Sequence, residues 1–383
     1  MRKKVCIGDL GTIVTGNTPP RNRPELYGNH TPFIKATDIS ESEKYTYYPE
    51  ECYSEEGYNK YIKSLIPKGS TCVVTIGSIG KKMTMAHCGL FINQAMNAII
   101  PNTDYDKEYV YYAVKNILGN IKKLDSGTAS GRENVSKSAF SKMEIWVEQD
   151  LSIQQRIATI LSRYDSLIEN YQKQIKLLEE SAQRLYKEWF VDLRFPGHEN
   201  TKIVDGIPEG WEKKKVGDLI SKVRRTKQVS ANNYLNSGCI PVIDQSRNYI
   251  AGYTNDIESL VEVTIPYIVF GDHTRVLKYV PFSFAKGADG TQLIMSNDLE
   301  RMPQSLFYNS LIEIDLSNYS YARHFKYLKE GYILVPSKDI AQRYDKVVSQ
   351  YFQSIQKRRD QIRHLTEARD RLLPKLMSGK IEV

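Results

Sequence analysis

Several short strings in this 383-residue sequence combine residue types that enzymes use, but none has the spacing that the chemistry needs. An adenine methylase that flips its base needs Asn or Asp, two prolines and an aromatic in succession, which residues 17–21 (Asn-Thr-Pro-Pro-Arg) do not supply. A P-loop needs four residues between its glycines and a final Ser or Thr, and residues 77–82 (Gly-Ser-Ile-Gly-Lys-Lys) have neither. Asp104 and Glu108, ahead of Lys115, are better explained as solvated charges at a helix start than as a nuclease centre. The sequence therefore predicts a protein that is not an enzyme.

The cysteines and histidines form neither a disulfide framework nor a metal site. The five cysteines are scattered, and no two are spaced Cys-X-X-Cys. His87 stands next to Cys88, but no other ligand lies at metal-binding spacing. No run reaches the roughly 18–20 apolar residues of a membrane helix. We therefore expect a reducing, cytoplasmic setting and no membrane partner.

Composition permits a polyanionic partner without demanding one. Lys and Arg number 53 against 45 for Asp and Glu, a formal net charge of +8. Tyrosine is abundant, with 26 copies against 11 of Phe, which suits half-wet interfaces and phosphate contacts or simply reflects an AT-rich genome. The length is too great for one ordinary core and predicts two domains or more.

The sequence contains an internal duplication. Ile-Gly-Asp-Leu at residues 7–10 returns as Val-Gly-Asp-Leu at 216–219, an offset of 209 (216 minus 7). A second match, Gln174-Ile175 with Gln361-Ile362, has an offset of 187 (361 minus 174) and continues without a gap from Ile153/Ile340 through Trp189/Leu376. Each half is therefore a variable block followed by a shared tail, and the second block is shorter by about 22 residues.

The tails have the heptad spacing of long helices, each of about 35–40 residues. Neither can expose an apolar stripe to water, so we expect the two to pack on each other in antiparallel fashion. The alternative is that each packs back on its own block. The predicted seam of the first helix is Ile153, Ile157, Ile160, Tyr164, Leu167, Tyr171, Ile175, Leu178, Ala182, Leu185 and Trp189; that of the second is Ile340, Tyr344, Val347, Tyr351, Ser354, Ile362, Leu365, Leu372 and Leu376.

These features predict an α+β fold in which two globular domains are separated by two long antiparallel helices, a coiled-coil spacer with internal pseudo-two-fold symmetry. Phe195-Pro196-Gly197 ends the first helix, and a linker leads to the second block. The predicted parts are a first recognition domain at 1–150, a first helix at 151–195, a linker at 196–210, a second recognition domain at 211–337 and a second helix at 338–383.

At its motifs the chain resembles the specificity subunit of type I restriction–modification systems. Pro-Glu-Gly-Trp at 208–211, ahead of 216–219, is similar to the opening of a domain in that family. Thr-Gly-Asn-Thr-Pro at 15–19 follows the first copy. The remaining motifs are Thr-Ile-Gly-Ser-Ile-Gly-Lys at 75–81, Asn-Gln-Ala at 93–95 and Gln-Gln-Arg-Ile-Ala at 154–158. The chain departs from the pattern at 148–150 and 336–338, where Pro-Glu-Gln is often found, and at 271–275, where Gly-Asp-His-Thr-Arg replaces the glycine hairpin.

The resemblance implies that each block is a target recognition domain that reads one half of a bipartite, asymmetric sequence in double-stranded DNA. It also implies two adenine-methylating subunits docked on the helices, and motor-nuclease subunits that complete the complex. S-adenosylmethionine, ATP and Mg²⁺ would belong to those partners, and this chain would hold no cofactor or metal.

Base reading requires donors and acceptors on loops that reach base edges, with Arg suited to guanine and Gln or Asn to adenine. For each candidate the simpler alternative is a plain surface turn or a phosphate contact. The first-block candidates are Lys35, Thr37, Ser78, Lys81, Lys82, Gln94, Thr128, Arg132 and Asn134. The second-block candidates are Gln245, Ser246, Arg247, Asn248, His273, Arg275, Lys286, Thr291, Gln292, Arg323 and Lys326. The rival function is a structural adaptor whose blocks bind proteins.

Overall fold

The computed structural model describes residues 2–125, 133–224, 226–287, 289–318 and 323–383. The chain divides into two compact units: Met1–Asn170 with Gln361–Val383 form unit 1, and Tyr171–Asp360 form unit 2. Each unit combines a block of strands and short helices with one half of each of two long helices. The fold is therefore α+β, as the sequence predicts.

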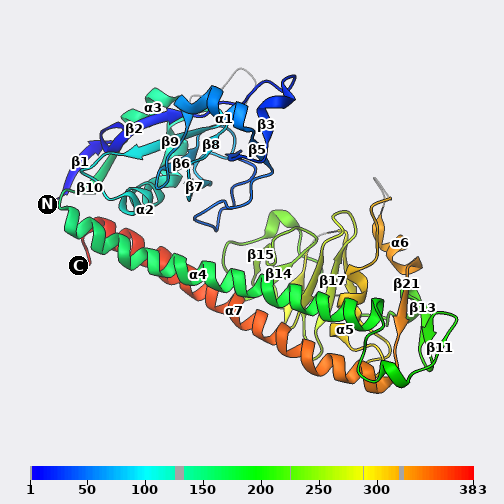
Figure 1. Ribbon diagram of the computed structural model, residues 1–383. Coiled ribbons are helices and arrows are strands. Elements are labelled where there is room, and N and C mark those ends of the chain that lie inside the picture. Colours follow the sequence, from blue (N-terminus) through cyan, green and yellow to red (C-terminus); the bar gives the residue numbers. More distant parts are fainter. Residues whose placement is uncertain (1, 126–132, 225, 288, 319–322) are drawn as a thin grey trace. The chain divides into compact units, whose positions relative to one another are not determined.

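Unit 1 contains two four-stranded sheets, with strand orders β2-β9-β6-β7 and β3-β5-β4-β8 (Figure 1). Apolar and β-branched side chains favour strands here; β6, for example, is the fully buried run Thr-Cys-Val-Val. The elements are β1 (Arg2–Cys6), β2 (Gly11–Thr15), β3 (Tyr27–Gly28), β4 (Thr31–Ile34), β5 (Glu51–Tyr53), α1 (Glu55–Tyr61), β6 (Thr71–Val74), β7 (Met83–Met85), β8 (Phe91–Ile92), β9 (Met96–Pro101), α2 (Lys107–Ile117), α3 (Lys137–Lys142), β10 (Glu144–Glu148) and the start of α4 (Leu151–Tyr186).

Helix α2 supplies a large part of the unit 1 core through three almost fully buried tyrosines, Tyr109, Tyr111 and Tyr112. The Tyr109 hydroxyl accepts a hydrogen bond from the Glu148 amide at 2.7 Å, so its polar end is satisfied inside the core. Asp106 caps the helix by accepting the Tyr109 amide at 2.9 Å. Part of the tyrosine excess therefore serves core packing rather than an interface.

Unit 2 repeats this design with a four-stranded sheet in the order β15-β14-β19-β16 and a three-stranded sheet in the order β18-β17-β20. Its elements are β11 (Ile203–Val204), β12 (Ile207–Pro208), β13 (Glu212–Lys215), β14 (Ile240–Ile243), β15 (Gly252–Thr254), β16 (Leu260–Val261), β17 (Tyr267–Gly271), β18 (Leu277–Val280), β19 (Phe284–Lys286), β20 (Thr291–Ile294), α5 (Gln304–Ile312), α6 (His324–Glu330), β21 (Tyr332–Val335) and most of α7 (Lys338–Ser378).

The duplication predicted from the sequence is confirmed in the elements that begin and end each block. The first strand of each block pairs antiparallel with the strand just before the long helix, β1 with β10 and β13 with β21. The repeated Gly-Asp-Leu motifs form the 3-10 helices Ile7–Leu10 and Val216–Leu219. Each helix begins with the same backbone bond, Ile7 N to Met143 O at 2.8 Å and Val216 N to Gly331 O at 2.9 Å.

The long helices α4 and α7 lie side by side and run antiparallel (Figure 1). In unit 1 Arg369 pairs with Asp165 at 2.5 Å, and in unit 2 Arg359 pairs with Glu179 at 3.0 Å. The residue numbers of the paired positions rise along α4 as they fall along α7, which is the pattern of antiparallel helices. Each helix also packs on its own block, so both packing arrangements considered for the tails occur. The α-helical part of α4 ends at Tyr186 and continues as a π-helical turn, Lys187–Val191.

The predicted seam is wrong by one position in the middle of both helices. Leu167 and Val347, both assigned to the seam, are 45% and 37% exposed. The buried stripe instead runs through Leu161, Asp165 and Ile168 in α4, and through Val348, Phe352 and Ile355 in α7. The two stripes match at the offset of 187. In the first copy, the sequence pattern does not reveal this register because Asp165, a charged residue, interrupts the apolar stripe.

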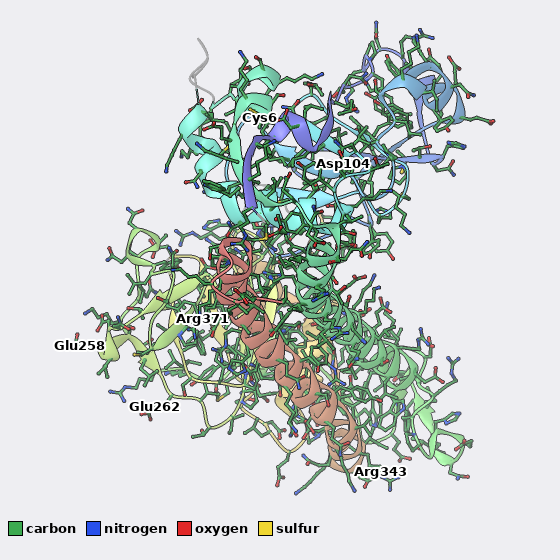
Figure 2. The ribbon with its side chains drawn as sticks, turned by 90° about the vertical axis from the view of Figure 1, so that its left-hand side faces the viewer. Cys6, Asp104, Glu258, Glu262, Arg343 and Arg371 are labelled. Atoms are coloured by element: carbon green, nitrogen blue, oxygen red, sulfur yellow. The ribbon has the colours of Figure 1, made fainter. Side chains whose placement is uncertain are left out.

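The exposed faces of the helices combine charged residues with a few apolar ones, which include Leu167, Leu177 and Val347. Arg343 and Arg371 belong to α7 and lie on its exposed side (Figure 2). In the part of the chain that the structure describes, no helix has both the length and the apolar character needed to cross a membrane.

Candidate nucleic-acid interface

In unit 1 the polar loops predicted to read bases are held together by the parallel pairing of β4 with β8. Because parallel strands end at the same edge, the loops that follow Ile34 and Ile92 lie next to each other. The Asn93 amide donates to the Ile34 carbonyl at 3.0 Å, and the Thr18 hydroxyl donates to the side-chain oxygen of Gln94. This edge therefore gathers segments from three separate stretches of the sequence.

The glycine hairpin between β6 and β7 is attached to the same edge. Thr75 N donates to Ala95 O at 2.9 Å, and Gly77 N donates to Glu133 O at 3.0 Å. Gly77 and Gly80 have φ values of 87° and 75°, which favour glycine and let the backbone turn tightly. The Lys82 ammonium reaches across to the Ala36 carbonyl at 3.3 Å. The structure thus joins the 35–38 loop, the hairpin, the 93–95 loop and residues 133–135.

The first-block candidates differ in availability. Thr37, Ser78, Lys81 and Gln94 are exposed, whereas Lys82 and Asn134 are partly buried. Thr128 and Arg132 lie outside the described residues.

Lys35 is less available than its position in the loop suggests. Its ammonium pairs with the carboxylates of Glu50 and Glu51, the latter at 3.6 Å, and its side chain is 17% exposed. The hydrogen bond to Glu50 raises the pKa of Lys35, although burial opposes the shift. A phosphate would have to compete with two glutamates for this lysine.

Unit 2 builds an equivalent face at the equivalent place. Its parallel pair is β14 with β19, and Gly287 N donates to Ile243 O at 2.8 Å. Asp272 N donates to Gly290 O at 2.7 Å, matching Thr75 and Ala95 of unit 1. Residues 272–276, which connect β17 to β18, replace the glycine hairpin of unit 1. The missing glycine motif therefore reflects a shorter hairpin tip in the same position.

Gln245, predicted as an adenine reader, uses its side chain between loops. Its amide nitrogen donates to the Asp289 carbonyl at 2.9 Å, and its amide oxygen accepts the His273 amide at 3.1 Å. Its backbone carbonyl accepts the Thr274 hydroxyl at 2.5 Å. In this geometry Gln245 fixes three loops of the face relative to one another.

The other second-block candidates fall into three groups. The residues Arg247, Asn248, His273, Arg275, Arg323 and Lys326 are exposed. Ser246, Lys286 and Gln292 are partly buried, and burial lowers the pKa of Lys286 against the opposing charge of Asp289. Thr291 is 1% exposed within β20, so its side chain does not reach the surface.

Arg275 has a constrained position at the hairpin tip. Its φ of 62° is rare for a residue with a side chain, and one guanidinium nitrogen donates to the Leu316 carbonyl at 3.0 Å.

Sequence reasoning missed Lys278, which lies in β18 directly beneath the 244–248 loop. Its side chain is only 4% exposed, and burial lowers its pKa to about 8, with Asp244 opposing that shift. In the sequence it alternates with Leu277 and Tyr279 and looks like an ordinary solvent-facing strand residue. Only the structure shows where it points.

The remaining surface of unit 2 is mixed in charge. Glu258 and Glu262 project from the loops around β16 (Figure 2), and Glu258 pairs with Lys227 at 3.0 Å. Within the described ranges, no cluster of three or more His, Cys, Asp or Glu side chains could hold a metal ion. The two loop faces present exposed hydrogen-bonding and cationic groups on loops that follow the parallel strand pairs.

Comparison with known proteins agrees with this architecture. Residues 2–180 match the family described as "Type I restriction modification DNA specificity domain". Over 98% of its length the chain is 28% identical to the Type I restriction enzyme MjaIX specificity subunit of Methanocaldococcus jannaschii, covering 93% of that protein. Over 142 residues it is 33% identical to the Type I restriction enzyme HindI specificity subunit of Haemophilus influenzae, which is 37% of this chain and 30% of that protein.

The fold has a counterpart among solved structures. A crystal structure of a type I restriction–modification system S subunit from M. genitalium aligns with a TM-score of 0.59 at 18% identity, covering 98% of this chain and 96% of that one. The family match identifies residues 2–180 as a type I restriction–modification DNA specificity domain. Over nearly its full length the chain is similar to type I restriction enzyme specificity subunits.

Proposed function

We propose that this chain is the DNA-reading subunit of a type I restriction–modification complex, and that each unit reads one half of a bipartite, asymmetric target. The observation that carries the proposal is the loop face that occurs twice. Equivalent parallel strand pairs and equivalent loop-to-loop bonds support it in both units, while the side chains displayed on it differ. A shared scaffold with different displayed groups suits two readers of different sequences.

In unit 2, Arg247 and Asn248 are the strongest base-reading candidates because both are exposed on a loop fixed at its base. Arg247 suits a guanine and Asn248 an adenine in the major groove. Arg275, Arg323 and Lys326 would neutralise phosphates and set the register. In unit 1, Ser78, Lys81 and Gln94 would have the corresponding roles.

The chemistry of the complex would lie outside this chain. The exposed faces of α4 and α7 would dock two adenine-methylating subunits, and motor-nuclease subunits would join them in the cytoplasm. S-adenosylmethionine, ATP and Mg²⁺ would be bound by those partners. This chain would supply sequence choice and geometry.

The test is a binding titration of the chain with its methylation subunits on duplex DNA, over a series of salt concentrations. Reading of DNA predicts binding that falls steeply with salt, because phosphate contacts release counterions, and a preference for one sequence that persists at about 0.15 M salt. Binding that is absent, or that shows neither salt dependence nor sequence preference, would favour a protein adaptor instead.

A further inference from the structure

Lys278 joins the two ends of the loop that carries the unit 2 base-reading candidates. Its ammonium donates to the Asp244 carbonyl at 2.8 Å and to the Asn248 carbonyl at 2.5 Å. The same nitrogen lies 3.8 Å from the Asp244 carboxylate. One buried cation thus holds the first and last residues of the 244–248 loop, and Arg247 lies between them.

The rest of the loop is ordered around the same anchor. The Asp244 carboxylate accepts the Ser246 amide at 2.9 Å and the Ser246 hydroxyl at 2.6 Å, which closes a tight turn. The Tyr249 hydroxyl, just beyond the loop, donates to the Tyr279 carbonyl at 2.6 Å. Only Arg247 and Asn248 are left exposed, so the loop presents its reading groups from a fixed base.

A buried lysine is costly unless its charge and donors are used, so its place here calls for a role. Unit 1 manages the equivalent strand position with a neutral residue. Counted from the matching bonds at the hairpin ends, Val74 to Lys82 and Gly271 to Val276, Lys278 corresponds to Thr84. The Thr84 hydroxyl donates to the Lys44 carbonyl at 3.1 Å and accepts the Thr46 hydroxyl at 3.2 Å, so its neutral bonds reach residues 44 and 46 of the preceding connection. The cationic anchor, Lys278, therefore occurs in the unit whose loop carries the exposed Arg247.

We propose that Lys278 is a positioning residue that fixes the conformation of the 244–248 loop and so determines the base preference of unit 2. This inference rests on the proposed DNA-reading function. Lys278 itself does not reach the surface and touches no base. It acts through Arg247 and Asn248 by limiting the positions from which they meet a base edge.

The experiment measures methylation of a DNA library by the complete complex with its methylation subunits. One library randomises the half-site read by unit 2 and fixes the other half; a second library does the reverse. Lys278→Met keeps the length of the side chain and removes its donors. It is expected to reduce discrimination at the unit 2 half-site about tenfold or more and to leave the unit 1 half-site within about twofold of the wild type.

Two further variants separate anchoring from packing. Lys278→Arg keeps cationic donors and is expected to retain more discrimination than Lys278→Met, whereas a packing role alone would favour the better-fitting methionine. Lys44→Met removes a lysine of similar burial from unit 1, where its side chain is 5% exposed, and is expected to leave the unit 2 half-site unchanged. If Lys278→Met gives no folded complex, Lys278→Gln takes its place with the same expectation.

One outcome is a wild-type complex that discriminates at both half-sites and a Lys278→Met variant that keeps the same discrimination at the unit 2 half-site. That result would overturn the role of Lys278 and leave the proposed function intact. Equal loss at both half-sites would also overturn it, because the effect would then be general. A wild-type complex without discrimination at either half-site would instead overturn the proposed function, and this inference with it.

Discussion

The two units have the same fold, but they differ at one buried position between the long helices. Unit 1 has an ion pair there, and unit 2 has apolar side chains. In unit 1 that point is the ion pair of Asp165 with Arg369, whose side chains are 8% and 5% exposed. At the offset of 187, the matching residues in unit 2 are Phe352 and Ala182, which are 6% and 1% exposed. The strand pairing and loop faces are nevertheless equivalent, so the fold does not depend on whether charged or apolar side chains occupy this position.

The neighbouring core residues follow the same division. In unit 1 the Tyr112 hydroxyl donates to Asp165 at 2.5 Å, and Asp165 raises the Tyr112 pKa further above the value that burial alone would give. In unit 2 Phe352 stacks on Tyr279 with ring centroids 4.2 Å apart. A buried ion pair has a geometry that only one partner and one register satisfy, whereas aromatic contact tolerates small shifts. Unit 1 therefore specifies how α4 meets α7 more strictly than unit 2 does.

The largest expected effect comes from breaking that ion pair. Arg369→Ala leaves Asp165 buried without its cation and should lower the free energy of unfolding by about 3–5 kcal/mol. Urea denaturation followed by circular dichroism measures the loss. The matched control is the triple change Tyr112→Phe, Asp165→Leu and Arg369→Met, which gives unit 1 an apolar seam and should return stability to within about 1 kcal/mol of the wild type. A triple variant as unstable as Arg369→Ala would contradict this account.

The next effect concerns the loop faces. Arg247→Ala should lose about 10- to 100-fold of the discrimination at one base of the unit 2 half-site, because a bidentate contact to guanine disappears. The unit 1 half-site should be unaffected. Methylation of randomised duplexes measures both, and Lys213→Ala, which removes an exposed cation on β13, is the control. An unchanged sequence preference in Arg247→Ala would remove Arg247 from the reading set.

A third effect depends on pH. Lys115 in α2 has its pKa lowered to about 8 by burial and by the Arg369 charge, and unit 2 has Ile312 at the matching place, nine residues after the helix cap. Because the folded-state pKa is below the unfolded value, the charged lysine destabilises the fold below pH 8. This destabilisation decreases as the pH rises from about 8 to 10.5, because the lysine first loses its charge in the folded state and, near pH 10.5, in the unfolded state as well.

Lys115→Met should therefore raise the free energy of unfolding by roughly 2 kcal/mol at pH 7 and by little near pH 10.5. Urea denaturation of both proteins at a series of pH values measures the difference, in which the other titrating groups cancel. A benefit that stays constant with pH would show that packing, not charge, is responsible.

The smallest effect concerns helix capping. Asp106 caps α2, whereas Pro303 starts α5 with no side-chain cap. Asp106→Ala should cost about 1 kcal/mol of stability by leaving the Tyr109 amide unsatisfied. Thermal unfolding checks it against Asp104→Ala, a nearby change that removes no cap; equal losses in the two variants would contradict the capping role.

The sequence alone predicts the duplication and the two long helices, because periodicity and repeated motifs depend on local order. It places Ser78 and Arg247 in exposed loops, but it also assigns Lys286, Thr291 and Gln292 to loops although they lie in strands. It does not predict that Asp165 lies in the helix seam, because burial of a charge depends on a partner 204 residues away. Nor does it predict that Gln245 holds loops together or that Lys278 anchors one, since both roles require knowing which loops the sheets bring side by side.

The most direct test of two independent reading units is to map modified adenines by long-read sequencing of DNA from cells that carry the system. The wild type is compared with a chain in which residues 1–150 come from another specificity subunit. If the two units read independently, the target is split, and the exchange changes one half and leaves the other intact. A change in both halves, or a single unsplit target, would contradict independent reading.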